Sequence, residues 1–185
     1  MNSSIVKLIE DNTELLQQLD AVLGVLDDTL YCKLDERVHD ASIGGHVRHV
    51  LDHYSCLLTG LAQGVIEYDN RERKLEIEES RPVALKRLQR TIEQLQTIAG
   101  TAREGDTLQV NLLTCNGDTA QQPAAGASYC SSLARELAFL HSHTVHHNAS
   151  IAVLLRLHGA SELVPQDLGI APATAQYQEQ KKCAR

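Results

Sequence analysis

The sequence lacks tryptophan and has a single phenylalanine, Phe139, and a single methionine, so large aromatic side chains can contribute little to its core. Apolar residues nevertheless make up 43% of the 185 residues, a share sufficient for one full-sized core. We therefore expect residues 1–185 to form a single domain whose core consists mainly of Leu, Ile, Val and Ala.

Clustered positive charge and long apolar runs are also missing. The formal net charge is −7, whereas nucleic-acid binding needs clustered Lys and Arg. The most basic stretch, Arg71 to Lys74, is interrupted by Glu72, which indicates a solvated helix face or connector. No apolar run approaches the roughly 20 residues that cross a bilayer. The start of the chain lacks the basic region and cleavage pattern of a signal peptide. We expect no nucleic-acid partner, no membrane partner and a cytoplasmic location.

Cysteine pairs of the C-x-x-C type are absent. The five cysteines are odd in number and widely spaced: Cys32, Cys56, Cys115, Cys130 and Cys183. This pattern favours neither a disulfide framework nor a thiolate zinc site, so we expect reduced thiols.

Apolar residues recur at helical spacing in four segments and predict four long helices. The expected helices run from Ser4 to about Leu26, from Asp40 or Ser42 to about Ala62, from Pro82 to about Gly100, and from Ser131 or Ser132 to about Leu157. Residues 101–130 are not helical in pattern, and residues 107–112 alternate like a strand, which predicts a small irregular or hairpin insertion. One or two further helical turns are expected from Ala173 to Lys181.

The length of the second connector bears on topology. Residues 63–80 could extend to roughly 55 Å, whereas a helix of the expected length spans about 30 to 35 Å. The second and third helices can therefore run parallel, joined by a crossover. The predicted fold class is all-α, a four-helix bundle.

Seven of the nine histidines fall in two clusters on the second and fourth expected helices. They are His46, His49 and His53, and His141, His143, His146 and His147. Imidazole is a common ligand of zinc, nickel, copper and iron. His143 and His147 are four residues apart and continue an apolar helical stripe, so we expect both to face the core.

A third ligand would have to come from the second helix, and periodicity does not decide which histidine supplies it. His46 and His53 lie somewhat nearer the centre of its apolar stripe than His49 does. On the fourth helix, His146 lies at the edge of the pair, as an outer partner or alternative ligand, and His141 lies away from it. The alternative is a surface cluster of histidines without a metal.

Two segments resemble the DinB-like superfamily of bacterial proteins, bundles described as metal-dependent enzymes. Residues 42–52, SIGGHVRHVLD, are similar to its second-helix motif. Residues 135–137 and 142–147, REL and SHTVHH, are similar to its fourth-helix motif. The resemblance implies an up-down-down-up bundle and a divalent metal ion, zinc, nickel or iron, held by His49, His143 and His147. Asn148-Ala149-Ser150 stands where a Gly-Gln pair often follows in relatives, so the substrate stays open.

Two functions follow as expectations. The first is an enzyme whose metal activates water or a thiol, either a hydrolase or a transferase or isomerase acting on a small molecule. Some relatives use a low-molecular-weight thiol, which favours a thiol-dependent transferase or isomerase. Its general base is not determined, with Asp52, Tyr54 and His146 as candidates. The second is a non-catalytic metal-binding or stress-response protein. A hemerythrin-like dinuclear site is disfavoured, because the bridging carboxylates are not at the required spacing. Apolar helix faces in excess of one core are compatible with a homodimer.

Overall fold

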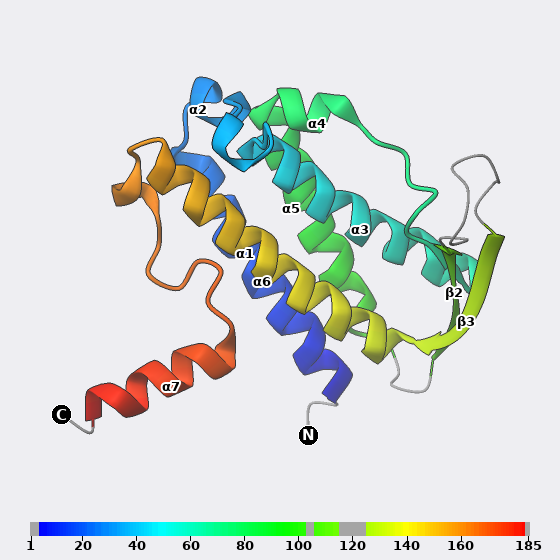
Figure 1. Cartoon of the computed structure of the whole chain (residues 1–185). Helices are drawn as coiled ribbons and strands as arrows, with labels where there is room; N and C mark the ends of the chain where they lie inside the picture. Colours follow the sequence, from blue (N-terminus) through cyan, green and yellow to red (C-terminus); the bar gives the residue numbers. More distant parts are fainter. Residues whose placement is uncertain (1–3, 103–105, 115–124, 184–185) are drawn as a thin grey trace.

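A computed structural model describes residues 4–102, 106–114 and 125–183 (Figure 1). Four long helices pack side by side in it: α1 (Ser4–Val25), α3 (Ile43–Gln63), α5 (Arg81–Ile98) and α6 (Leu133–Leu157). Helix α1 contacts α5 and α6, and α3 contacts the same two helices. The four helices expected from apolar periodicity are confirmed, with bounds close to those expected.

Local sequence signals explain where these helices begin and end. The Ser42 side chain accepts a hydrogen bond from the Gly45 backbone N–H at 2.9 Å and so caps the start of α3. Ser132 caps α6 in the same way through the backbone N–H of Arg135. Helix α3 ends at Gly64, whose φ of +74° is easily adopted only by a residue without Cβ.

The core between the helices is mainly aliphatic but contains one polar network. The Tyr54 hydroxyl, fully buried, donates to Asn12 Oδ1 at 2.7 Å and lies 3.1 Å from Thr144 Oγ1. The Asn12 amide in turn donates to the Leu137 carbonyl oxygen at 3.1 Å. The network therefore joins α1, α3 and α6, and its hydrogen bonds offset the cost of burying these polar groups.

The expected all-α fold is wrong, because the described residues include a three-stranded mixed sheet. Its strands, in the order β1-β2-β3, are β1 (Val65–Glu67), β2 (Thr107–Thr114) and β3 (Ala125–Ser132). Strand β1 pairs parallel with β2, and β2 pairs antiparallel with β3. Ile66, Leu108 and Val110 bury their side chains from these strands in the same core as the helices. The sheet is therefore part of the packed structure and not an appended loop.

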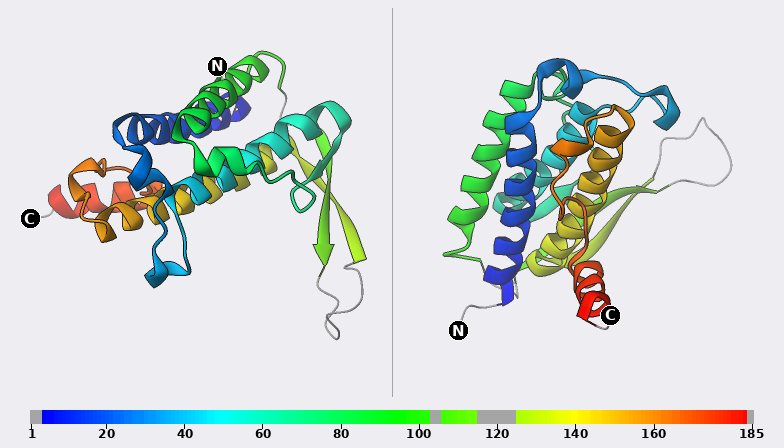
Figure 2. Two further views of the ribbon diagram at one scale, coloured as in Figure 1. Left: turned by 90° about the horizontal axis from the view of Figure 1, so that it is seen from above. Right: turned by 90° about the vertical axis from the view of Figure 1, so that its left-hand side faces the viewer.

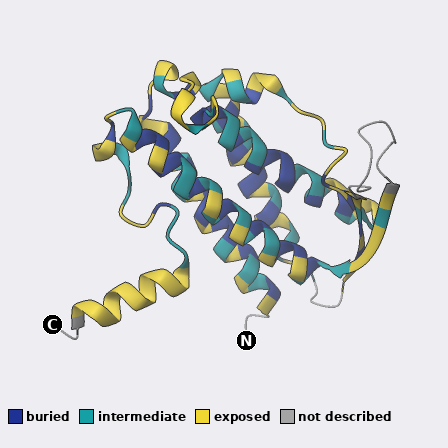
Figure 3. Ribbon diagram, in the orientation of Figure 1, coloured by how far each residue is buried: buried dark blue, intermediate teal, exposed yellow. Residues whose placement is uncertain are grey.

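The plain four-helix bundle is also wrong in its number of helices, since the described residues hold seven. The additional ones are α2 (Asp28–Cys32), α4 (Leu75–Glu79) and α7 (Pro172–Cys183), with two short 3₁₀ turns at Glu36–Val38 and Ser161–Leu163. Helix α7 is exposed along the length for which burial is described (Figure 3). Figure 2 shows α7 and the strands at opposite ends of the molecule.

A crossover formed by residues 64–80 joins α3 to α5, and these two helices run in the same direction (Figure 1). The crossover contains β1 and α4. It returns so closely along α3 that a Cβ on Gly60 would lie 2.6 Å from Ile66 Cγ1 and 2.7 Å from the Val65 carbonyl oxygen. The crossover thus covers one side of α3 and positions residues 68–74 beside the histidine-bearing part of that helix.

The structure also bears on the expected free thiols and on the expected lack of membrane-spanning helices. Cys32, Cys56 and Cys130 are free thiols, whereas Cys115 and the side chain of Cys183 lie outside what the structure describes. None of the described helices has both the length and the apolar character needed to cross a membrane.

Candidate metal centre

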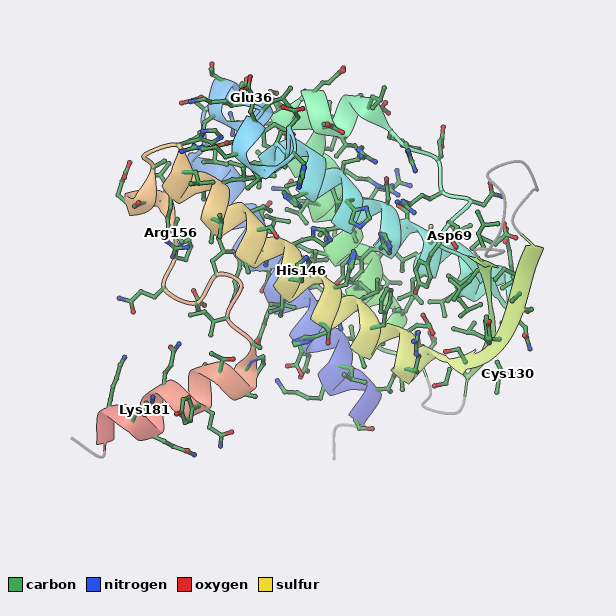
Figure 4. The ribbon with its side chains drawn as sticks, in the orientation of Figure 1. Glu36, Asp69, Cys130, His146, Arg156 and Lys181 are labelled. Carbon is green, nitrogen blue, oxygen red and sulfur yellow. The ribbon has the colours of Figure 1, made fainter. Side chains whose placement is uncertain are left out.

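Five histidines from α3 and α6 form one cluster in the contact between these helices. Neighbouring rings have centroids 4.2 to 5.1 Å apart. The members are His46, His49 and His53 from α3, and His143 and His147 from α6. His141 is outside this cluster. His146, labelled in Figure 4, is exposed on α6 and presents its ring edge-on to that of His147.

One ring nitrogen, His143 Nε2, lies close to two others. His143 Nε2 lies 3.1 Å from His49 Nε2 and 3.2 Å from His147 Nε2. In a tetrahedral zinc site with metal–nitrogen distances of 2.0 to 2.1 Å, two ligand nitrogens are about 3.3 Å apart. The three histidines that the family resemblance implies as ligands therefore lie in one cluster, with His143 Nε2 next to the Nε2 atoms of the other two.

Hydrogen bonding alone does not satisfy these nitrogens. A neutral imidazole has one N–H and one lone pair, so His143 Nε2 can form a well-directed hydrogen bond with only one of its two neighbours. His143 Nδ1 is buried and has no hydrogen-bond partner among the described residues. A divalent cation can accept one lone pair from each of the three rings at once, which hydrogen bonds between the rings cannot do. The three histidine nitrogens therefore fit a divalent metal ion.

His53 offers a fourth nitrogen to the same space. Its Nδ1 donates to the His49 carbonyl oxygen at 2.8 Å, so its lone pair is on Nε2. Ligand atoms of His49, His53 and His143 all lie within 4.8 Å of one another. This set of three differs from the one that the family resemblance implies, because it contains His53 in place of His147.

Neighbouring side chains fix two of the rings. The buried His53 ring stacks on the Tyr68 ring with centroids 5.4 Å apart, and the Tyr68 hydroxyl donates to Glu136 Oε2 at 2.9 Å. His46 Nδ1 lies 2.9 Å from His147 Nδ1. When His147 donates its Nδ1 proton in this contact, its Nε2 keeps the lone pair that a metal needs.

Burial keeps the cluster neutral. It lowers the pKa of His49 to about 3, of His143 to about 4 and of His147 to about 2, and positive charge on neighbouring histidines would lower these pKa values further. The pKa values of His46 and His53 are also lowered, first by burial. Neutral imidazole is the form that binds a metal, so at neutral pH no proton has to leave these rings first.

An arginine and a buried carboxylate border the cluster. Arg71 Nη2 lies 3.5 Å from His49 Nδ1, and Arg71 Nη1 donates to the Tyr68 carbonyl oxygen at 2.7 Å. Asp52 pairs with Arg48 at 3.0 Å and lies 4.0 Å from Arg71 Nε. Burial raises the pKa of Asp52, although both arginines favour its charged form. Residues 71–74 form a connector, one of the two forms expected for this stretch, and within it the Arg71 side chain turns inward.

The three candidate bases have different surroundings. Tyr54 is fully buried in the network with Asn12 and Thr144, and burial raises its pKa well above its usual value. Asp52 is held by Arg48, and His146 is at the exposed edge of the cluster. Tyr68 and Arg71 were missed by sequence reasoning, because the crossover that carries them has no periodic pattern.

Comparison with known proteins gives one partial similarity. No family model matches the chain, and no solved structure matches it. The curated protein FK506-binding protein 5 from Rhizopus delemar is 34% identical over 116 residues, which cover 61% of this chain. The aligned region covers 27% of that protein, so the chain spans only about a quarter of the relative's length. A match of this extent does not establish a family for the chain.

Proposed function

We propose that the protein is a metal-dependent enzyme of the DinB-like type, with one divalent ion, zinc, nickel or iron, bound by His49, His143 and His147. The observation that carries the proposal is the close approach of His143 Nε2 to His49 Nε2 at 3.1 Å and to His147 Nε2 at 3.2 Å. The rings are neutral and are held by two packed helices, so little has to rearrange for them to bind an ion.

A divalent ion at this position supplies Lewis-acid chemistry, lowering the pKa of a bound water or thiol to near neutrality. The protein's residues hold and orient the ligands. His46 fixes the His147 ring, and the Tyr68 ring packs against His53. The proposed substrate is a small molecule, with a low-molecular-weight thiol as cosubstrate in a transferase or isomerase reaction.

A second candidate, a non-catalytic metal-binding protein, is favoured by His53. Its Nε2 lone pair is free and lies within ligand distance of the same space. If His53 completes a four-histidine shell, no position is left for water or substrate, as in structural sites. The number of ligand histidines therefore separates the enzyme from the non-catalytic protein.

Metal content tests the site shared by both candidates. Purified protein loaded with zinc and dialysed should retain one ion per chain, and His143→Ala and His147→Ala should each lose most of it, because two imidazoles bind zinc weakly. His141→Ala, on the same helix but outside the cluster, is the matched control and should retain the ion. Full zinc content in both ligand variants would refute the proposal.

A cobalt-substituted protein distinguishes the two functions. An open fourth position lets glutathione or cysteine coordinate as a thiolate, which adds a thiolate-to-cobalt charge-transfer band in the near ultraviolet. A four-histidine shell gives no band in the wild type and a band in His53→Ala. The enzyme proposal predicts the band in both proteins.

A further inference from the structure

A cavity of 270 Å³ is lined in part by Arg71, whose Nη2 also lies 3.5 Å from His49 Nδ1 of the histidine cluster. Helix α3, the crossover and α5 enclose it, and its lining includes Ser55, Cys56, Thr59, Asn70, Arg71 and Arg87. Its volume is just below the range of about 300 to 1,000 Å³ for pockets that hold drug-sized ligands. The cavity is therefore suited to a small polar ligand.

The charged groups around the cavity differ in how well they are paired. Asp52 is bound by Arg48 at 3.0 Å, and Glu72 by Lys74 at 3.4 Å. The oxygens of Glu67 accept hydrogen bonds from Asn70 and Asn111, both at 3.3 Å. The carboxylates of the lining thus already have partners.

The two arginines of the lining have guanidinium N–H groups that make no hydrogen bond among the described residues. Arg87 donates Nη2 to the neutral Ser55 hydroxyl, the one hydrogen bond of its guanidinium group among the described residues. Arg71 donates Nη1 to the Tyr68 carbonyl oxygen, and its Nη2 lies 3.5 Å from His49 Nδ1. Its buried Nε lies 4.0 Å from Asp52 Oδ2, beyond hydrogen-bond distance, and makes no hydrogen bond among the described residues. Buried donors of a permanent cation are costly to leave unsatisfied, and guanidinium groups match the geometry of carboxylate and phosphate oxygens.

We propose that this cavity binds a small oxyanion, a carboxylate or phosphate group, held by Arg87 and Arg71. The bound anion would then lie beside the histidine cluster, with Arg71 between them. The proposed anion site contains no metal ion, so anion binding can be tested in protein treated with chelator. Its failure would leave the metal proposal intact, and loss of the metal site would leave the anion site intact.

The proposal can be tested by calorimetric titration of chelator-treated protein. Inorganic phosphate and succinate are titrated separately, and chloride at equal ionic strength is the control. At least one of the two should bind saturably at one site per chain. Arg87→Met should weaken binding at least tenfold, whereas Arg90→Met, an exposed arginine of the same helix, should leave it unchanged. Phosphate binding alone would identify a phosphate ligand, and succinate binding alone a carboxylate. Absence of saturable binding, or equal weakening by Arg90→Met, would overturn the proposal.

Cys56 provides a second readout that needs no substitution. Its half-buried thiol lines the cavity, whereas the exposed Cys32 does not. The anion should slow the labelling of Cys56 by N-ethylmaleimide, followed by mass spectrometry, and leave the labelling of Cys32 unchanged. An unchanged rate at Cys56 under saturating anion would count against the site even if Arg87→Met fails to fold.

Discussion

The imidazole rings of the cluster differ in which nitrogen is engaged. His53 donates a hydrogen bond from Nδ1 to a backbone carbonyl oxygen, and His147 Nδ1 contacts His46 Nδ1. Each of these two rings can therefore present Nε2 to the cluster. Within the part of the chain that the structure describes, His143 has no hydrogen-bond partner at Nδ1, and it has two close neighbours at Nε2. His143 Nε2 is therefore the ring nitrogen that lies close to both of the other proposed ligand atoms, and removal of His143 should affect the site most directly.

The lowered histidine pKa values predict that the metal-free protein loses stability in mild acid. A histidine whose pKa is lower in the folded than in the unfolded chain binds fewer protons when folded. Here the pKa values of His49, His143 and His147 are about 3, 4 and 2, against about 6.5 in unfolded chains. The free energy of unfolding should therefore be highest above pH 6.5 and fall as the pH drops from 6.5 towards 5.

Denaturant unfolding in chelator at pH 7, 6 and 5 measures this dependence. The double variant His143→Asn with His147→Asn should show a smaller loss over the same interval, whereas His141→Asn should behave like the wild type. A free energy of unfolding that does not change between pH 7 and 5 would contradict the lowered pKa values.

Sequence reasoning found the right region of the site but not all its members. Spacings of three and four residues put His46, His49 and His53 on one face of a helix, so periodicity could not choose among them, and all three rings do reach the cluster. Arg71 could not be predicted, because its inward orientation depends on how the crossover packs against α3. The family resemblance, not the periodicity, selected His49.

At the scale of elements, the long helices were predictable and the short ones were not. Sustained apolar stripes and capping serines mark α3 and α6. Strand β1 has only three residues and helix α4 only five, too few to show a period. Strand β1 instead depends on pairing with β2, about forty residues later. The hairpin of β2 and β3 was therefore expected from the sequence, whereas β1 and the three-stranded sheet were not.

The close packing of β1 on α3 predicts opposite effects for two glycine substitutions. Gly60→Ala should destabilise the protein by about 1 to 3 kcal/mol, because the new Cβ would meet Ile66 and the Val65 carbonyl oxygen. Gly24→Ala, in the exposed last turn of α1 with nothing within 4 Å of the new Cβ, should stabilise it by up to about 1 kcal/mol. Thermal or denaturant unfolding measures both, and equal effects of the two substitutions would show that β1 does not constrain α3.

At the scale of the whole molecule, a metal ion in the cluster would link α3 to α6 beside the crossover. Binding to the folded chain alone stabilises it by about 2.7 kcal/mol when free metal is at 100 times its Kd, which corresponds to several degrees in Tm for a chain of this size. Zinc should therefore raise the Tm of the wild type and of His141→Ala, and chelator should reverse the rise. An equal rise in His143→Ala would place the stabilising ion elsewhere.

Anomalous diffraction from crystals of zinc-loaded protein, recorded on both sides of the zinc absorption edge, tests the central claim most directly. The account predicts one peak between α3 and α6, about 2.0 to 2.1 Å from the Nε2 atoms of His49, His143 and His147. A peak within that distance of His53 Nε2 as well would favour the non-catalytic protein. Anomalous density only at other positions, with the five rings of the cluster free of metal, would contradict the account.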